Sequence, residues 1–442
     1  MDSQMHPETL ELNGQSLCDV QEYRLKRRHR RSNSDPEFSP IRKTEMLFNF
    51  LTTLMTLGGA YYRPLNRKCP YLPWDFIYCC SVLFLCSIEA VRTFYYYEKG
   101  EDFATKIFKA IEQIYVIKML FSLLVSLIIV TPRLRRFFHS ADIYHTNWVT
   151  EVDMNEVMKQ VRNQKRRVIV CFVCLSGFRI FIGVLPMFQL QVCNNWAKPL
   201  LDRNVNRHLV AFICTFFRLF FQCADSMCYI FIYVLSAKLA DEFVAVASNL
   251  QQYLEDGGES DGSDLKQHRW RYLDLCDLMD TLDRALGPLI LHFCVFDLII
   301  VVLHVIAFMD FDLYGLSSKW TRVIGITSVV DKAMHMALLI YAGSNVSSKA
   351  KAVKPFLSRI DVESYTQAAF QEGFMFLQKV TQDHIGLTAW GMFNINKSFI
   401  VTVVSLGLTY AIIMMRFGMM ITQESASNST ASPTFVTATM SP

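Results

Sequence analysis

Apolar residues along this chain gather in long blocks separated by polar stretches. Seven blocks of about 20 residues stand out, and a helix of that length crosses a bilayer core of about 30 Å. They cover residues 75–94, 111–130, 168–188, 209–235, 285–308, 323–342 and 399–420. A backbone surrounded by lipid must satisfy its polar groups internally, as a helix does. The pattern therefore predicts an all-α membrane protein with seven transmembrane helices.

The polar stretches and the pattern of charge divide the rest of the chain. The apolar pattern of the fourth and fifth blocks continues beyond the membrane length, so these helices are expected to extend into a cytosolic bundle. The predicted segments are a disordered basic cytosolic arm at 1–45, an interfacial or packed helix at 46–70, the first six spans with their cytosolic extensions at 71–361, cytosolic anchor helices at 362–398, a pore-lining last helix at 399–420 and an extracellular tail at 421–442.

Charge sets the predicted orientation. Charged residues make up only 19% of the 442 residues, below the roughly 25% of soluble proteins. Lysine and arginine concentrate in the N-terminal arm, in the loop expected after the second block, which carries Arg133, Arg135 and Arg136, and in the segment after the sixth block. Because cytosolic flanks carry an excess of these residues, we expect the N-terminus to be cytosolic and the C-terminus extracellular. Asn428 in the tail is then a candidate glycosylation acceptor, since it begins an Asn-Ser-Thr triplet.

The thirteen cysteines do not suggest a disulfide framework, because most of them lie inside the apolar blocks. A small buried hydrophobic residue is the simpler interpretation of each, including the Cys171 and Cys174 pair within one block. The sequence contains no phosphate-binding loop, no HExxH and no nucleophile elbow. It therefore predicts no enzyme, no cofactor, no metal and no nucleic-acid partner.

The end of the chain carries the most specific pattern. Residues 386–398 form a stretch of small residues with Gly391-Met392-Phe393 and then a short polar segment, and the last block closes with Thr409-Tyr410 and Arg416-Phe417. This arrangement resembles the C-terminal signature of the insect gustatory receptors, in which Thr-Tyr is followed by five apolar residues, Gln and Phe. The sequence departs from that signature at Arg416, which stands where the family has Gln.

The resemblance implies a ligand-gated, non-selective cation channel, opened by a small-molecule tastant in the plasma membrane of sensory neurons. It further implies a homotetramer, or a hetero-oligomer with related subunits, in which the last helix lines the pore. Ser405, Thr409, Ile413 and Phe417 lie near four-residue spacing on that helix. A ring of apolar side chains can close a pore by dewetting, so these are the candidate pore and gate residues. Packing against neighbouring helices would produce the same stripe.

Ionisable residues inside the apolar blocks form a second candidate site. Each is costly in lipid and is expected to face the interior of the helix bundle. A pocket with a few polar anchors in an apolar wall is typical of small-molecule sites. The ligand-pocket candidates are Arg179, Phe181, Phe217, Arg218, His304 and Asp331, and Asp297 is expected in the same network. The alternative is a set of structural ion pairs between helices.

A short motif in the N-terminal arm suggests a regulatory partner. Arg31-Ser32-Asn33-Ser34-Asp35-Pro36 resembles a 14-3-3 docking site, with Ser34 as the phosphorylated residue read by an arginine cluster on the partner. The alternative is that this basic arm binds the anionic inner leaflet of the membrane.

Two other functional classes remain open. A seven-span G-protein-coupled receptor would need an extracellular N-terminus, against the charge pattern, and the Asp/Glu-Arg-Tyr and Asn-Pro-x-x-Tyr motifs are missing. A transporter is less favoured, because the chain shows no paired broken helices and no repeated halves. An N-terminal epitope tag that is accessible only after permeabilisation would exclude the G-protein-coupled class.

Overall fold

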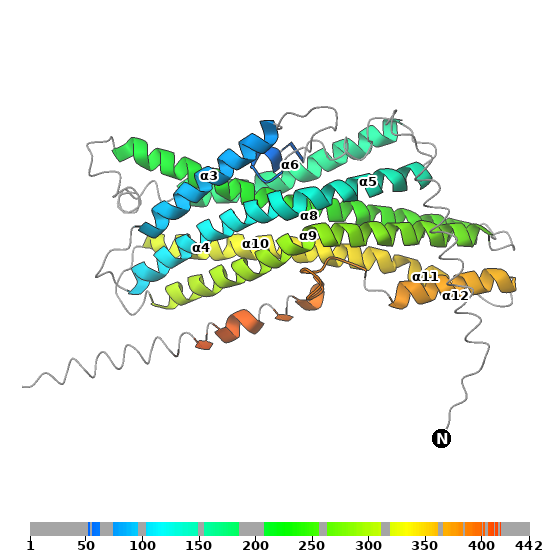
Figure 1. Cartoon of the computed structure of the whole chain (residues 1–442). Helices are drawn as coiled ribbons and strands as arrows, with labels where there is room; N and C mark the ends of the chain where they lie inside the picture. Colours follow the sequence, from blue (N-terminus) through cyan, green and yellow to red (C-terminus); the bar gives the residue numbers. More distant parts are fainter. Residues whose placement is uncertain are drawn as a thin grey trace, which may run out of the picture. The chain divides into compact units, whose positions relative to one another are not determined.

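The described part of the chain is almost entirely helical (Figure 1), which confirms the predicted helical fold class. The computed structural model describes residues 52–61 without 54, then 74–95, 103–148, 154–184, 207–255, 263–310, 319–360, 366–382, 385–399, 401–402, 405–410, 412–413 and 416. Three residues singled out in the sequence, Ser34, Phe417 and Asn428, lie outside this described part.

Most of the helices are long, and the described residues of each predicted span are helical. In chain order they are α3 (Trp74–Tyr95), α4 (Phe103–Val125), η1 (Ser126–Val130), α5 (Thr131–Trp148), α6 (Met154–Val184), α8 (Arg207–Glu255), α9 (Ser263–Asp310), α10 (Lys319–Ala350), η3 (Lys351–Val353), α11 (Lys354–Leu357) and α12 (Gln367–Gln382). The described residues from 397 to 416 are helical as well. Among described residues, three helical stretches are long and apolar enough to cross a membrane: Trp74–Val91, Ala110–Trp148 and Ser263–Ile306.

Two of the helices are much longer than a bilayer requires. Helix α8 has 49 residues and α9 has 48, which corresponds to roughly 70 Å each at 1.5 Å per residue. The fourth and fifth apolar blocks therefore do continue as helix beyond the length of a span, as the sequence predicts. Helices α8, α9 and α10 pack against one another along their length.

The region after the second span differs from the prediction. Residues such as Arg133, Arg135 and Arg136 were expected in a loop, but α4, η1 and α5 follow one another without a break. The π-helix η1 ends two residues before Pro132, whose ring clashes with the carbonyl one turn earlier in a regular helix. A wider π turn makes room at that point, so the helix continues where a proline would be expected to end it.

Helix α9 also contains a proline, and the carbonyl group that it frees has a new partner. Pro288 has no N–H to bond to the carbonyl oxygen of Arg284 four residues earlier. The guanidinium of Arg133 on α5 donates to that oxygen at 2.8 Å. A contact between two helices thus replaces one hydrogen bond inside α9, and leaves α9 with a weaker turn at Pro288.

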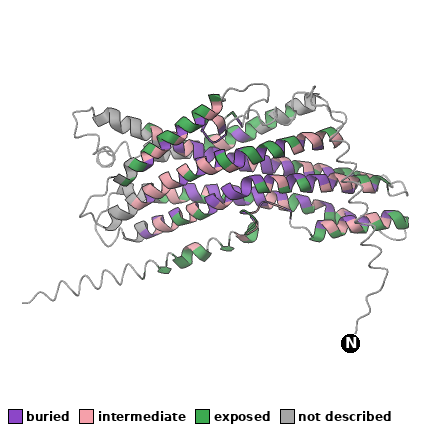
Figure 2. Ribbon diagram, in the orientation of Figure 1, coloured by how far each residue is buried: buried purple, intermediate pink, exposed green. Residues whose placement is uncertain are grey.

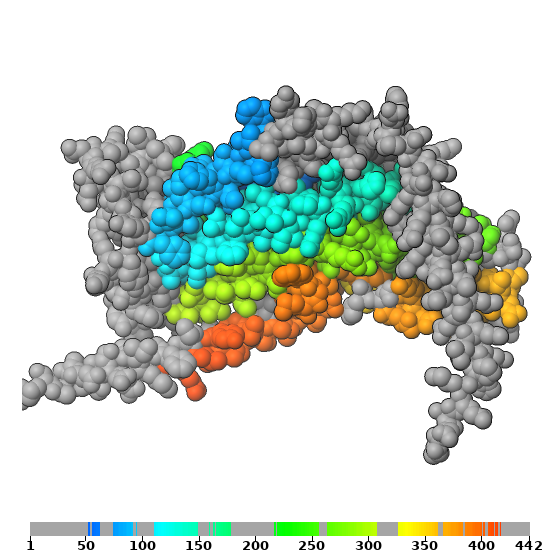
Figure 3. Space-filling model, viewed as in Figure 1, coloured from blue at the N-terminus to red at the C-terminus, as the bar shows by residue number. Residues whose placement is uncertain are grey.

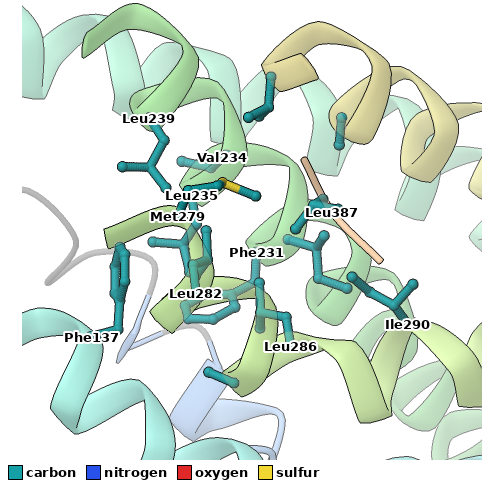
Figure 4. Packing of buried hydrophobic residues seen from close by; sticks show 14 of the residues in the cluster. Phe137, Phe231, Val234, Leu235, Leu239, Met279, Leu282, Leu286, Ile290 and Leu387 are labelled. Atoms are coloured by element: carbon teal, nitrogen blue, oxygen red, sulfur yellow. The ribbon is translucent and has the colours of Figure 1, made fainter. Parts of the chain in front are cut away.

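The core lies where the long helices meet. Buried residues concentrate along the inner faces of α5, α8, α9 and α10 (Figure 2). Phe231, Leu235 and Leu239 recur every four residues on α8 and meet Leu282 and Leu286 of α9 (Figure 4). This spacing places the side chains on one face of each helix. On α3 and α6, in contrast, many large apolar side chains are exposed, among them Phe84, Ile88, Val91, Val170 and Val173, as a lipid-facing surface requires.

The short helix near residue 55 packs against α3. Met55 is buried, and the hydroxyl of Tyr78 donates to the carbonyl oxygen of Leu57 at 2.7 Å. Gly59 has a φ of 74°, and a Cβ on it would lie 2.6 Å from a methyl group of Val82. Glycine is needed here for both the left-handed backbone and the close approach. The described part of segment 46–70 is therefore a packed helix.

The segment predicted as anchor helices contains one described helix and one turn. Helix α12 buries Phe376 and Val380, and Glu372 pairs with Arg269 of α9 at 2.8 Å. Residues 385–395 then form a compact turn, which lies against the long helices (Figure 1). The described helical residues from 397 onward follow it and are mostly exposed along the face seen in Figure 3, with Val401 and Leu408 more than half exposed.

Candidate functional site

Four helices bring charged side chains together in the interior of the protein. Lys118 comes from α4, Asp225 and Tyr229 from α8, Asp297 from α9, and Asp331, Lys332 and His335 from α10. All seven are buried. We call these seven residues the buried charge cluster. The spacing of Asp225 and Tyr229, and of Asp331 and His335, is four residues, so each pair lies on one helix face.

Lys118 is the centre of the cluster. Its ammonium Nζ lies 2.6 Å from Oδ1 of Asp297 and 3.1 Å from Oδ2 of Asp225. It also donates to the hydroxyl of Tyr229 at 3.1 Å, and that hydroxyl donates to the second oxygen of Asp297. Lys118 and Asp297 are 0% exposed. This lysine therefore joins α4 to both α8 and α9 through hydrogen bonds to charged groups, which are the stronger kind.

Lys332 is more loosely held. Its Nζ lies 3.7 Å from carboxylate oxygens of both Asp225 and Asp297 and 3.6 Å from Asp331. It also lies 4.7 Å from the centre of the Tyr115 ring, in a cation–π arrangement. Among the described residues this ammonium makes no hydrogen bond. Its contacts are electrostatic, at distances where a small rearrangement is needed for hydrogen bonding.

His335 of α10 makes a further contact with α8, through Ser226. Its Nδ1 lies 2.6 Å from the main-chain oxygen of Asp331, and its Nε2 lies 3.3 Å from the hydroxyl of Ser226. The imidazole meets the ring of Tyr229 edge-on at 4.7 Å, and Tyr229 stacks on Phe293 at 4.1 Å. Aromatic rings thus pack against the charged groups, and Nζ of Lys118 lies 5.2 Å from the centres of the Tyr229 and Phe293 rings.

The charges in the cluster nearly balance. Two lysines oppose three aspartates, so the formal charge is −1 when His335 is neutral. Burying an ion without a partner costs several kcal/mol, and removing one partner of a buried pair costs about 3–5 kcal/mol. The cluster therefore stabilises one arrangement of α4, α8, α9 and α10. It also presents carboxylate and ammonium groups in an otherwise apolar interior, as a polar ligand would require.

Comparison with known proteins identifies the family. The sequence profile described as "7tm Chemosensory receptor" matches residues 48–421. The chain belongs to this chemosensory receptor family.

Solved structures of one relative show the same fold. The olfactory receptor OR5 of the insect Machilis hrabei, in complex with eugenol, superposes with a TM-score of 0.63 at 14% identity and covers 84% of this chain and 98% of that chain. The structure of OR5 described without eugenol gives the same TM-score at 12% identity, with the same coverage. No curated protein matches the chain. The resemblance to insect chemoreceptors inferred from residues 386–417 is thus confirmed at the level of the family.

The structure places some of the predicted pocket residues of this chemosensory receptor in the cluster. Asp331 is a member, and Asp297 from the same predicted network is too. His304 is buried outside the cluster. Its ring lies 6.3 Å from that of Tyr115, which in turn contacts Lys332 of the cluster. Phe217 packs on Phe221 of its own helix. The side chains of Arg179, Phe181 and Arg218 lie outside the described part of the receptor, so their place in a pocket stays a prediction.

Lys118 is the residue that the sequence argument missed. It stands near the middle of the block 111–130 and is the only lysine or arginine in it. A lone ammonium at that depth requires an acidic partner inside the bundle, and this was the signal that could have identified it. The aspartates in the other blocks gain their partner from α4, which the sequence could not show.

Three of the four candidate pore residues lie on described helical residues near the end of the chain. Ser405, Thr409 and Ile413 are exposed, and the hydroxyl of Thr409 donates to the main-chain oxygen of Ser405 at 2.8 Å. Tyr410 and Arg416 of the family signature are exposed as well. None of the nine cysteines whose side chains are described forms a disulfide bond. No group of three or more metal-ligating side chains occurs among the described residues.

Proposed function

We propose that this chemosensory receptor is a ligand-gated, non-selective cation channel of the gustatory type, opened by a small-molecule tastant. The observation that carries the proposal is the C-terminal signature, in which the turn at 385–395 leads directly into a last helix bearing Thr409, Tyr410 and Arg416. The similar structure of OR5 contains eugenol, and a small-molecule ligand for this receptor is in keeping with that.

The proposed topology has seven membrane helices, a cytosolic N-terminus and an extracellular C-terminus. The concentration of lysine and arginine after the second and sixth spans supports this orientation. The extensions of α8 and α9, together with α12, then form a bundle on the cytosolic side. The proposed location is the plasma membrane of sensory neurons. In this arrangement Asn428 is extracellular and open to glycosylation, and Ser34 is cytosolic and open to phosphorylation and 14-3-3 docking.

The proposed assembly is a homotetramer, or a hetero-oligomer with related subunits, with the last helix at its centre. Large apolar side chains on that helix, including Val401, Leu408 and Tyr410, are exposed in the single chain. Exposed apolar side chains on a membrane helix suit either lipid or a neighbouring subunit, and the resemblance of the C-terminal signature to the gustatory receptors favours the subunit. Ser405, Thr409, Ile413 and Phe417 would then line the pore, with the apolar pair Ile413 and Phe417 forming the gate.

Expression of the full-length receptor in oocytes under voltage clamp tests the proposal. Bath application of a broad panel of sugars, alkaloids and other small molecules is expected to evoke a cation current with at least one compound. A current that appears only with co-expressed G-protein-gated channels would favour the G-protein-coupled class instead. An N-terminal epitope tag that is accessible on intact cells would contradict the proposed topology.

The ligand pocket has its own prediction. With an active compound in hand, Arg218→Ala and Asp331→Ala are expected to reduce the evoked current while surface expression persists, because each removes a polar anchor from an apolar interior. Current and surface biotinylation are measured on the same cells. Normal responses in both variants would assign these residues a purely structural role.

Arg416 provides a test of the pore geometry. Successive residues of a helix are rotated by about 100°, so a pore-facing Phe417 directs Arg416 toward the boundary between subunits. Replacing Arg416 with Gln is therefore expected to change gating or assembly and to leave the reversal potential unchanged. Four pore-facing arginines would instead favour anions. A reversal potential that moves from chloride-like to sodium-like in Arg416→Gln would show that the arginine faces the pore.

A further inference from the structure

The turn that precedes the last helix is a closed unit. In residues 385–395, which we call the junction hairpin, the N–H of Ala389 donates to the carbonyl oxygen of Phe393 at 2.9 Å, and that of Ile395 donates to Leu387 at 2.9 Å. Trp390 and Gly391 have φ values of 53° and 75°, so both adopt the left-handed conformation. Such strain at Trp390 persists only where surrounding contacts hold the backbone.

Those contacts come from α9 and α10, and they are contacts with the main chain. At Gly287 of α9, an added Cβ would lie 3.1 Å from the backbone N and Cα of Trp390. At Gly343 of α10, an added Cβ would lie 2.9 Å from Cβ of Ile395 and closer still to its carbonyl oxygen. Glycine at these two positions lets the hairpin backbone lie directly on both helices. The position of the hairpin is therefore set by α9 and α10 together.

Asp283 of α9 fixes the hairpin through both of its carboxylate oxygens. Oδ1 accepts the N–H of Thr388 at 2.6 Å, and Oδ2 accepts the hydroxyl of the same residue at 2.6 Å. That hydroxyl in turn accepts the N–H of Gly391 at 2.9 Å. One carboxylate thus orients the two ends of the strained turn, through short hydrogen bonds of the charge-assisted kind.

The hairpin is joined as firmly to the last helix. The side-chain oxygen of Asn396 accepts the N–H of Phe399 at 3.1 Å and the hydroxyl of Ser398 at 2.6 Å, which is an N-terminal cap. The rings of Phe393 and Phe399 stack at 4.8 Å. The hairpin and the first turn of the last helix therefore move as one body.

The same two helices carry the buried charge cluster. Asp297 lies 14 residues beyond Asp283 on α9, or about 21 Å at 1.5 Å per residue, and the weaker turn at Pro288 lies between them. On α10, Lys332 lies 11 residues before Gly343, or about 17 Å. A shift of α9 against α10 at the cluster must then displace the hairpin that rests on both.

We propose that Asp283 and Thr388 are positioning residues that couple α9 to the last helix, so that the relative position of α9 and α10 sets the state of the gate. The coupling to a gate rests on the proposed channel function, whereas the mechanical connection does not. When the two hydrogen bonds are removed, the hairpin and the first turn of the last helix lose their attachment to α9, and the last helix leaves its closed position more often.

The test uses the full-length receptor in lipid nanodiscs and in oocytes. The variants are Asp283→Ala, which removes both acceptor oxygens, Thr388→Val, which removes the hydroxyl, and their combination. Thr388→Ser keeps both hydrogen-bond donors and serves as the conservative rescue. Asp277→Asn removes the same charge from an exposed position on α9 and serves as the matched control. Hydrogen–deuterium exchange is followed in peptides from α8, α9 and residues 385–402, and resting Na⁺ conductance is measured with no compound added and normalised to surface receptor.

The first three variants are expected to exchange about tenfold faster in residues 385–402 and not in α8, the order of effect of one lost charge-assisted hydrogen bond. Their resting Na⁺ conductance is expected to rise about threefold or more. A threefold change in the open population corresponds to a free-energy change of less than about 1 kcal/mol. The double variant is expected to show less than the sum of the two single effects, because both changes remove the bond between the Thr388 hydroxyl and Asp283. Thr388→Ser and Asp277→Asn should match the wild type.

Three results would overturn the proposal. Unchanged exchange would mean that the Asp283 bonds do not hold the hairpin. Faster exchange throughout α8 and α9 would mean that they stabilise the whole fold. Faster exchange confined to residues 385–402, together with wild-type conductance, would mean that the hairpin does not act on the gate. A wild-type receptor that passes no current with any compound of the panel would instead refute the channel function, and the exchange pattern would still decide whether Asp283 positions the hairpin.

Discussion

Replacing Lys118 with methionine is expected to lower the free energy of unfolding by about 3–5 kcal/mol, the range for removing one partner of a buried ion pair. Methionine keeps most of the length and apolar volume of the side chain, so the loss is mainly electrostatic. Among the described residues, the nearest ammonium left to Asp225 and Asp297 is then that of Lys332, at 3.7 Å, while Asp297 keeps the hydrogen bond from Tyr229. The formal charge of the cluster falls from −1 to −2, in an interior that cannot solvate it. The apparent melting temperature of a fluorescent fusion, followed by size-exclusion chromatography, measures the effect.

Two variants make this expectation specific. Lys118→Met combined with Asp297→Asn restores the formal charge to −1 and should recover a large part of the lost stability, since the uncompensated carboxylate is gone. Arg167→Met breaks the ion pair with Asp241, in which both side chains are about half exposed at 43% and 54%, and should cost no more than about 1 kcal/mol. A Lys118→Met receptor as stable as the Arg167→Met control would contradict the assignment of Lys118 as the centre of the cluster.

The sequence predicted the helices better than it predicted their junctions. Block length and apolar content identified the positions of the long helices, including the extensions of α8 and α9, because lipid and the bundle core impose the same requirement along many residues. The break expected after residue 130 was wrong, since a π turn accommodates Pro132. The carbonyl freed by Pro288 finds its partner in Arg133, more than 150 residues earlier in the sequence, and no local pattern reports such a pair.

The candidate site was predicted in part for a similar reason. A charged residue inside an apolar block requires a partner in the bundle interior. On this basis the sequence predicted that Asp297 and Asp331 belong to one network. Which residue supplies the partner depends on the rotation and depth of each helix. Lys118 was overlooked although its block made it conspicuous, and the aromatic packing of Tyr229 and Phe293 becomes visible only when α8 and α9 are placed together. The junction hairpin falls inside the segment 362–398 that was predicted as anchor helices, and the left-handed backbone of Trp390 depends on contacts with α9 and α10 that no local pattern reports.

Replacing Gly343 with alanine is expected to destabilise the receptor by about 1–3 kcal/mol, the usual cost of overpacking, although alanine is the better helix former. The new methyl group would lie 2.9 Å from Cβ of Ile395 and nearer to its carbonyl oxygen. Ile395 is buried, and its main chain belongs to the closed turn, so the hairpin must move as a unit away from α10. Gly177→Ala on α6 is the matched control, since no atom lies within 4 Å of the added Cβ there. That change should stabilise the receptor by up to about 1 kcal/mol through helix propensity and reduced freedom of the unfolded chain. Opposite signs for the same substitution in two helices, measured as shifts in apparent melting temperature, would locate the close contact at the hairpin. A Gly343→Ala receptor that is stabilised like Gly177→Ala would show that residues 385–395 do not rest on α10.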